Sequence, residues 1–197
     1  MSKGKLIIIG VIALIVIFFV GCGISSNNSM VGKEEGVDSQ WANVQNAYQR
    51  RADLIPNLVT TVKAYASHEE GTLTAVVEAR AKATQIQLTP DQLTEENLQK
   101  YQEAQGQLGA ALGRLLMVQE NYPDLKANTN FLQLQDELAG TENRISTERR
   151  VFNEKVQAYN AYIRRFPNSI IANIGGFDKK AYFQADQDAQ SAPKVEF

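Results

Sequence analysis

The chemistry open to this chain is limited by its metal ligands and nucleophiles, because its 197 residues contain one histidine, His68, and one cysteine, Cys22. Zinc sites are usually built from several Cys and His side chains, so one copy of the chain cannot supply such a site. A di-iron helical bundle would need two Glu-x-x-His pairs, and His68 is alone. We therefore predict no metal site and no other cofactor.

Catalytic motifs are not recognisable either. The sequence has no Gly-x-Ser-x-Gly elbow, no phosphate loop and no dinucleotide-binding fingerprint. His68 stands beside Glu69 and Glu70 at an expected helix start, where a solvent-exposed side chain is the simplest interpretation. We expect a protein that is not an enzyme, with an unrecognised hydrolase as the alternative.

Charged side chains inside apolar stripes are more informative. Arg51 is the one polar position in the apolar series of residues 37–65, and Arg80 and Glu148 occupy similar positions on later helices. We expect a polar layer inside a bundle, in which arginine pairs with Glu142 or Glu148 and fixes the register of the helices. Two alternatives remain: these side chains extend along an apolar surface to the solvent, or they form a ligand-binding site.

The elements that must position these residues begin with an apolar segment, residues 1–24, that we expect to anchor the chain in a membrane. No charge occurs between Lys5 and Lys33, and residues 6–24 number 19, close to the roughly 20 that a helix needs to cross a bilayer. The first 15 of these also fit the core of a secretory signal. Both interpretations leave Lys3 and Lys5 in the cytoplasm and place the bulk of the chain outside it, at a bacterial membrane or envelope.

Cys22 makes this segment a candidate lipoprotein signal. Phe19-Val20-Gly21-Cys22 resembles a bacterial lipobox, in which a small residue precedes a cysteine that is cleaved and lipidated. The match is partial, because leucine is usual where Phe19 stands. The alternative is an apolar cysteine near the end of an uncleaved membrane helix. In either case we expect the polar residues 25–33 to form a tether that leaves the membrane.

The remainder is expected to be all-α. Apolar residues recur at alternating steps of three and four, which is typical of helices packed along their length, and no stretch alternates like a half-buried strand. The stretches cover about residues 37–65, 68–86, 90–122 and 128–166. We predict an elongated antiparallel bundle of about four helices over residues 34–167. An irregular extension over residues 168–197 is expected to fold back onto the bundle end.

Local signals add detail to these helices. Pro56 removes a backbone hydrogen bond to residue 52, so we expect a kink or a short break there. Ser67 begins a sequence with the form of a capping box, and Thr89-Pro90 marks another helix start. Glycines inside the third helix predict the close approach of a neighbouring helix, which would compensate for their cost. They are Gly106, Gly109 and Gly113.

The distribution of charge argues against nucleic acid as a partner. Residues 1–32 carry two lysines and no acid, a net charge of +2, and residues 33–197 carry 18 basic and 22 acidic side chains, a net charge of −4, which gives −2 in total. Affinity for phosphate backbones comes mainly from Lys and Arg. We predict no nucleic-acid binding.

Five motifs, in this order, resemble the LemA family. They are Arg-Arg-Ala-Asp-Leu-Ile-Pro-Asn-Leu-Val over residues 50–59, Val-Glu-Ala-Arg-Ala over 77–81, Glu-Asn-Tyr-Pro over 120–123, Gly-Thr-Glu-Asn-Arg-Ile over 140–145, and Tyr182-Phe183. The resemblance implies one membrane anchor followed by an all-helical bundle outside the bilayer, with no established enzymatic activity. Cys22, and the lack of an aromatic residue over residues 28–31, depart from the family pattern and bear on the type of anchor.

Two functions from different classes follow from these observations. The first is a membrane-anchored scaffold or interaction module at the cell envelope that binds a protein partner, or a second copy of itself, through helix faces. The second is a membrane-remodelling or lipid-associated structural protein. Direct action on lipid calls for a basic amphipathic face, which helices of net negative charge do not supply, although the aromatic residues of the C-terminal extension favour it.

Overall fold

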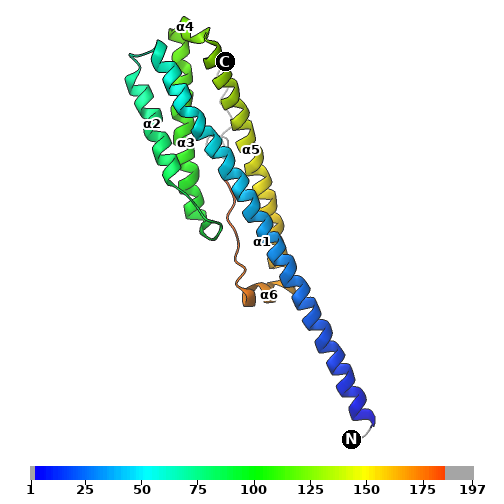
Figure 1. Ribbon diagram of the computed structural model, residues 1–197. Helices are drawn as coiled ribbons and strands as arrows, with labels where there is room; N and C mark the ends of the chain where they lie inside the picture. The colour runs from blue at the N-terminus through cyan, green and yellow to red at the C-terminus, as the bar shows by residue number, and fades with distance from the viewer. Residues whose placement is uncertain (1–2, 185–197) are drawn as a thin grey trace, which may run out of the picture. The chain divides into compact units, whose positions relative to one another are not determined.

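The computed structural model describes residues 3–184, apart from the side chains of residues 3, 5–9 and 19. Within this range the fold contains helices and no strand, so the all-α prediction is confirmed. The helices are α1 (Lys3–Tyr65), α2 (Glu70–Gln85), the 3₁₀ turn η1 (Pro90–Gln92), α3 (Glu95–Met117), the 3₁₀ turn η2 (Val118–Asn121), α4 (Pro123–Lys126), α5 (Thr129–Arg164) and α6 (Asn168–Gly175) (Figure 1).

The chain divides into two compact units, which we describe separately. Unit 1 combines the residues up to Ser39 with Glu154–Lys180, and unit 2 combines Gln40–Asn153 with the residues from Ala181 onward. The long helices α1 and α5 each contribute residues to both units. Unit 1 therefore contains the apolar N-terminal segment and α6, and unit 2 contains the helical bundle.

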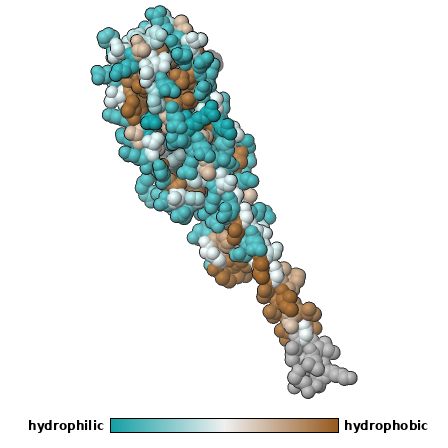
Figure 2. Space-filling model, in the orientation of Figure 1, coloured by the Kyte–Doolittle hydropathy of each residue, from teal (hydrophilic) through white to brown (hydrophobic). Residues whose placement is uncertain are grey.

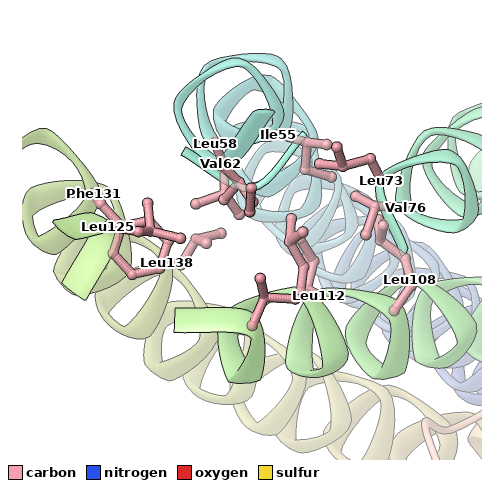
Figure 3. Close-up of a cluster of buried hydrophobic side chains, with 14 of the residues drawn as sticks. Ile55, Leu58, Val62, Leu73, Val76, Leu108, Leu112, Leu125, Phe131 and Leu138 are labelled. Carbon is pink, nitrogen blue, oxygen red and sulfur yellow. The ribbon is translucent and has the colours of Figure 1, made fainter. Parts of the chain in front are cut away.

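The bundle of unit 2 is built from the later part of α1, from α2 and α3, and from the earlier part of α5, and consecutive helices run in opposite directions (Figure 1). The three–four spacing turns one apolar face of each helix inward. Their side chains meet in a core formed by Ile55, Leu58, Val62, Leu73, Val76, Leu108, Leu112, Leu125, Phe131 and Leu138 (Figure 3). Full burial of each such side chain contributes about 1.5–3 kcal/mol, so this core holds the four helices together.

Helix α1 continues through two places where the sequence predicts a change. The polar residues 25–33, expected as a tether, are helical, and Ser26 and Met30 are buried within unit 1. Pro56 also lies inside α1, so of the two expected outcomes, a kink or a short break, the break does not occur. Because proline has no N–H, the carbonyl of Ala52 loses its helical donor, and Arg80 Nε of α2 donates to it at 2.8 Å.

Two of the expected helix starts have different outcomes. Helix α2 begins at Glu70 without a side-chain cap, so the capping box expected from Ser67 is wrong, because Ser67 lies in the turn before the helix. The start at Thr89 is confirmed, since Thr89 and Gln92 form a capping box on η1. The longer helix α3 follows, and its own cap is the Thr94 side chain.

The glycines of α3 do not mark a close helix approach, so that expectation is wrong. A Cβ atom added at Gly106 or Gly113 would meet no atom within 4 Å, and one at Gly109 would lie 3.8 Å from Arg51 Nη1, which is an ordinary contact. The backbone of α3 therefore has room for side chains at all three positions.

Replacing Gly106 or Gly113 with alanine is expected to raise the free energy of unfolding by roughly 0.5–1 kcal/mol, because alanine restricts the unfolded chain and no neighbour has to move. Urea denaturation of the full chain in detergent, followed by circular dichroism, measures the change. Gly175→Ala is the matched control with the opposite sign, since its Cβ atom would lie 2.8 Å from the Phe177 ring. A loss of stability at Gly106 or Gly113 would contradict the open space around them.

The C-terminal extension begins as helix α6, and residues 177–184 follow it without helical structure. Residues 185–197 of the expected extension lie outside the described residues. In unit 1, Asn160 of α5 forms two hydrogen bonds with the backbone of Lys180, at 2.9 and 3.0 Å. In unit 2, Asn153 of α5 does the same with the backbone of Phe183, with both bonds at 2.9 Å. The extension is thus held along α5 by two paired amide contacts.

Candidate functional site

Arg51 lies at the centre of a polar layer in unit 2. Its side chain is 4% exposed, and its Nη1 donates to Glu142 Oε1 of α5 at 2.7 Å. Its Nη2 donates to the side-chain Oε1 of Gln105 in α3 at 2.6 Å and to the backbone carbonyl of Gln105 at 3.0 Å. One guanidinium therefore connects α1, α3 and α5, and its planar arrangement of donors allows it to reach both partners at once.

The two ends of this layer have different environments. Glu142 is 47% exposed, so water solvates its carboxylate even while it accepts from Arg51. Gln105 is buried, and its Nε2 donates to the carbonyl of Ala83 in α2 at 3.4 Å. The Arg51 guanidinium also lies over the Tyr48 ring, 5.2 Å from its centroid. We define the polar layer as Arg51, Gln105 and Glu142, which come from α1, α3 and α5, and α2 meets it through the carbonyl of Ala83.

Arg80 and Glu148 form their contacts outside this layer. Arg80 donates to the carbonyl of Ala52, and not to either glutamate. Glu148 accepts from Gln40 Nε2 at 2.7 Å, and its other oxygen lies 3.8 Å from Arg144 Nε. The four charged residues singled out by the sequence therefore fall into three separate groups, of which the arginine–glutamate pair is Arg51 with Glu142.

Gln105 and Gln40 are members of these groups that the sequence analysis missed. Gln105 stands in the apolar series of α3 between Tyr101 and Leu108, so it interrupts that stripe as Arg51 interrupts the stripe of α1. The prediction rested on charged residues in apolar stripes. An amide in such a stripe, as at Gln105, is the signal that identifies it.

An aromatic cluster adjoins the layer in unit 2 and consists of Trp41, Tyr101, Phe152 and Phe183. Trp41 has ring centroids of the other three within 5.3–6.0 Å, and its Nε1 donates to the carbonyl of Leu88 at 2.9 Å. Phe183 comes from the C-terminal extension, and Asn153 fixes its backbone. Through this cluster the C-terminal extension packs against the bundle over a large apolar contact.

A cavity of about 230 Å³ lies next to the polar layer. Tyr48, Tyr101 and Gln105 line it together with side-chain amides from α1 and the loop after α2, including Gln45 and Gln87. None of its lining residues is charged. Its walls can donate and accept hydrogen bonds, and they offer no acid–base pair. Over residues 3–184, no group of three or more His, Cys, Asp or Glu residues is placed to hold a metal ion.

Burial raises the pKa of the Tyr101 hydroxyl well above its ordinary value near 10, and the nearby Tyr48 adds to the effect while Arg51 opposes it. A group whose pKa is raised by folding keeps its full contribution to stability below its unfolded pKa and loses it as the pH rises further. We therefore expect stability to fall above about pH 10, by up to about 1.4 kcal/mol per pH unit for this group.

Tyr101→Phe is expected to reduce this alkaline loss, measured as urea midpoints of the full chain at pH 8, 10 and 11. Tyr159 of unit 1, whose pKa is also raised mainly by burial, remains in the variant, so the difference between the two chains is the quantity to compare. Tyr182→Phe is the control at an exposed position. Identical pH profiles of wild type and Tyr101→Phe would show that the buried hydroxyl has no such role.

The remaining candidates lie on the surface. Cys22 is exposed on α1, and His68 is exposed in the turn between α1 and α2. The N-terminal part of α1 is the one stretch in the described chain that is long and apolar enough to cross a membrane. The side chains of residues 11–24 are exposed, apart from the undescribed one at 19, as expected of a surface that meets lipid.

Comparisons with known proteins agree with the motifs. A family model described as "LemA family" matches residues 40–197. Magnetosome protein MamQ 2 of Paramagnetospirillum magneticum is 29% identical over 189 residues, which cover 87% of this chain and 69% of that protein. Magnetosome protein MamQ of Magnetospirillum gryphiswaldense is 24% identical over 93% of this chain and 74% of its own length. Protein LemA of Metamycoplasma hominis is 23% identical over 94% of this chain and 80% of its own length.

Proposed function

Because the chain belongs to the LemA family and carries one apolar segment long enough to span a membrane, we propose that it is a membrane-anchored, non-enzymatic scaffold that presents its bundle to a protein partner at the bacterial cell envelope. The names of the relatives, magnetosome protein and LemA, describe no enzyme, which supports this reading. The positive charges before the apolar segment and their absence within it favour a bundle outside the cytoplasm. A lipid on Cys22 is the alternative form of the anchor.

The observation that carries the proposal is a set of exposed apolar side chains at one end of unit 2. Tyr65 ends α1, Met117 ends α3, and Leu132 lies in the first turn of α5, beside the short α4 (Figure 1). A hydrogen bond of 2.9 Å from Asn128 Nδ2 to the Tyr65 hydroxyl connects the start of α5 with the end of α1. Three helices thus present apolar side chains at the same end, which suits a protein partner with an apolar contact surface.

In this proposal the polar layer fixes the register of the helices, and so keeps the exposed apolar side chains together at one end of unit 2. Arg51 requires Gln105 and Glu142 at one register of α1, α3 and α5, because a shift of α3 or α5 by one residue would separate the guanidinium from one partner and a shift of α1 from both. Arg80 adds the same constraint between α2 and α1 through the carbonyl of Ala52. Buried polar contacts of this kind specify an arrangement more than they add stability.

Site-specific photo-crosslinking in cells tests the proposal. A photoreactive side chain at Met117 is expected to give a discrete crosslinked protein, whereas one at Glu103, an exposed position on the same helix α3, is expected to give none. Met117→Glu should also abolish crosslinking from Leu132, because a charge at this end would oppose an apolar contact. A product of twice the chain mass identifies a second copy as the partner. Crosslinking to lipid alone from Met117 would favour the lipid-associated function and contradict the scaffold.

A further inference from the structure

The short helix α6 in unit 1 carries an apolar face that no described part of the chain covers. Ile170 and Ile174 are four residues apart and share one face of the helix, and they are 53% and 83% exposed. Phe166, two residues before the helix, is 82% exposed. The opposite side is buried at Ala172. This pattern is the reverse of a helix on a water-exposed surface, where the outward face is polar.

The position of α6 relates this face to the membrane anchor. Ser26 Oγ of α1 donates to Asn168 Oδ1 at the start of α6, at 2.6 Å. At the other end, a Cβ atom added to Gly175 would lie 3.7 Å from Asn27 Oδ1. Both ends of a helix about 12 Å long therefore lie beside the same turn of α1, so α6 crosses α1 and does not run along it (Figure 1).

That turn of α1 directly follows the apolar stretch. Ile24 is the last residue of that stretch, and the two residues to Ser26 correspond to about 3 Å along the helix. If α1 crosses the bilayer, α6 lies parallel to the membrane plane at the level where the apolar core ends. Cys22 is about one turn before Ser26, so a lipid on Cys22 would place α6 at nearly the same depth. Figure 2 shows hydrophobic surface over α6 and over the N-terminal part of α1.

The charges around α6 suit an anionic surface. Helix α6 itself has no charged residue, and Arg164 and Arg165 precede it, while Asp178 and Lys179 follow it, all four exposed. Lys180 is partly buried and pairs with Glu34 of α1 at 2.9 Å. The free flanking charges therefore sum to a net positive value. An apolar face flanked by arginine and lysine is typical of helices that lie in the headgroup region of anionic membranes.

We propose that α6 is an interfacial helix whose face formed by Phe166, Ile170 and Ile174 inserts into the headgroup region of the membrane that anchors the chain. The insertion would add a second contact with the bilayer and fix the rotation of unit 1 about the axis of α1. This role requires the membrane anchor and is independent of the protein partner and of which side of the membrane the bundle occupies.

The test uses the full chain in vesicles of phosphatidylethanolamine and phosphatidylglycerol. On a Cys22→Ser background, Ile174→Cys carries an environment-sensitive dye, and Gln157→Cys is the matched control. Gln157 is exposed on α5 within unit 1, two turns before Arg164. Since Lys33 Nζ of α1 lies 5.2 Å from the centroid of the Tyr162 ring of α5, Gln157 is level with later residues of α1, roughly 18 Å beyond Ser26.

The dye at position 174 is expected to shift to the blue, to lose quenching by aqueous iodide, and to be quenched by lipids that carry a spin label near the headgroup. The dye at position 157 should show none of these changes. Flotation of the same samples reports whether the chain is anchored at all. Equal iodide quenching at both positions in floated vesicles would overturn the proposal. Protection at position 174 that disappears when the chain is diluted with excess lipid would assign the face to a second copy, and would also overturn it.

Discussion

Arg51→Ala is expected to lower the free energy of unfolding by about 3 kcal/mol. The substitution leaves the buried Oε1 of Gln105 without its donor, which costs about 1–3 kcal/mol, and removes the packed methylene groups of the arginine. The loss of the pair with Glu142 adds less than about 1 kcal/mol, because that carboxylate is half exposed and regains water. Chemical denaturation of the full chain in detergent measures the total change in the free energy of unfolding.

Three further variants separate the causes. Arg51→Lys is expected to recover less than half of the loss, because one ammonium cannot reach Gln105 and Glu142 together. Arg51→Met keeps most of the volume and removes the hydrogen bonds, so its loss relative to wild type isolates the hydrogen bonds, and its difference from Arg51→Ala isolates the packing contribution. Glu142→Gln is the mild control, with an expected change below about 1 kcal/mol. Similar denaturation midpoints for wild type, alanine and lysine chains would contradict a role of Arg51 in fixing the bundle.

Phe183→Ala is expected to cost about 3–5 kcal/mol and to loosen the end of the described chain on the rest of unit 2. The Phe183 ring stacks on Trp41, with centroids 6.0 Å apart, and meets Phe152 edge to face at 5.4 Å, while the Arg149 guanidinium lies 4.9 Å from its centroid. The variant would leave a cavity in this cluster. The described backbone of the extension would then be held in unit 2 only by exchangeable hydrogen bonds, which it forms with Asn153, Gln102, Arg149 and Leu93.

Trp41 reports this change directly, because it is the one tryptophan of the sequence. Its fluorescence should shift to the red in Phe183→Ala, and the urea midpoint should fall. Tyr182→Ala is the matched control, since the neighbouring side chain is exposed and its loss should change neither signal appreciably. An unchanged emission maximum in Phe183→Ala would show that the extension does not seal the cluster.

The sequence was sufficient to predict the helices because their apolar spacing is a local property. Leu58 and Val62 in α1, and Leu108 and Leu112 in α3, follow the three–four pattern that turns them into one core. Arg51 was found in the same way, as the polar position in such a stripe. The pairing with Glu142 required the relative register of α1 and α5, and spacing within one helix does not determine that register.

Where the structure differs from the sequence predictions, the cause is likewise a contact between residues far apart in the sequence or the space around a residue. Arg80 was expected near a glutamate, but it donates to the carbonyl of Ala52, which Pro56 leaves without its helical donor and which lies on another helix. The same contact explains why α1 continues through Pro56. Gly106 and Gly113 suggested a close neighbour, but glycine in a sequence gives no measure of the space around it. The role of residues 25–33 depended on α6, whose contact with Ser26 spans 142 residues of sequence.

The most direct test of the central claim, a bundle anchored in a membrane and presented outside the cytoplasm, is the labelling of a single cysteine in intact cells. On the Cys22→Ser background, Ser146→Cys places a thiol at an exposed position of α5 in unit 2. We predict that a membrane-impermeant maleimide labels this cysteine in intact cells as fully as in lysed ones, while the chain stays in the membrane fraction after alkaline carbonate washing. Labelling that appears only after the cytoplasmic membrane is opened, or release of the chain by carbonate, would contradict the account.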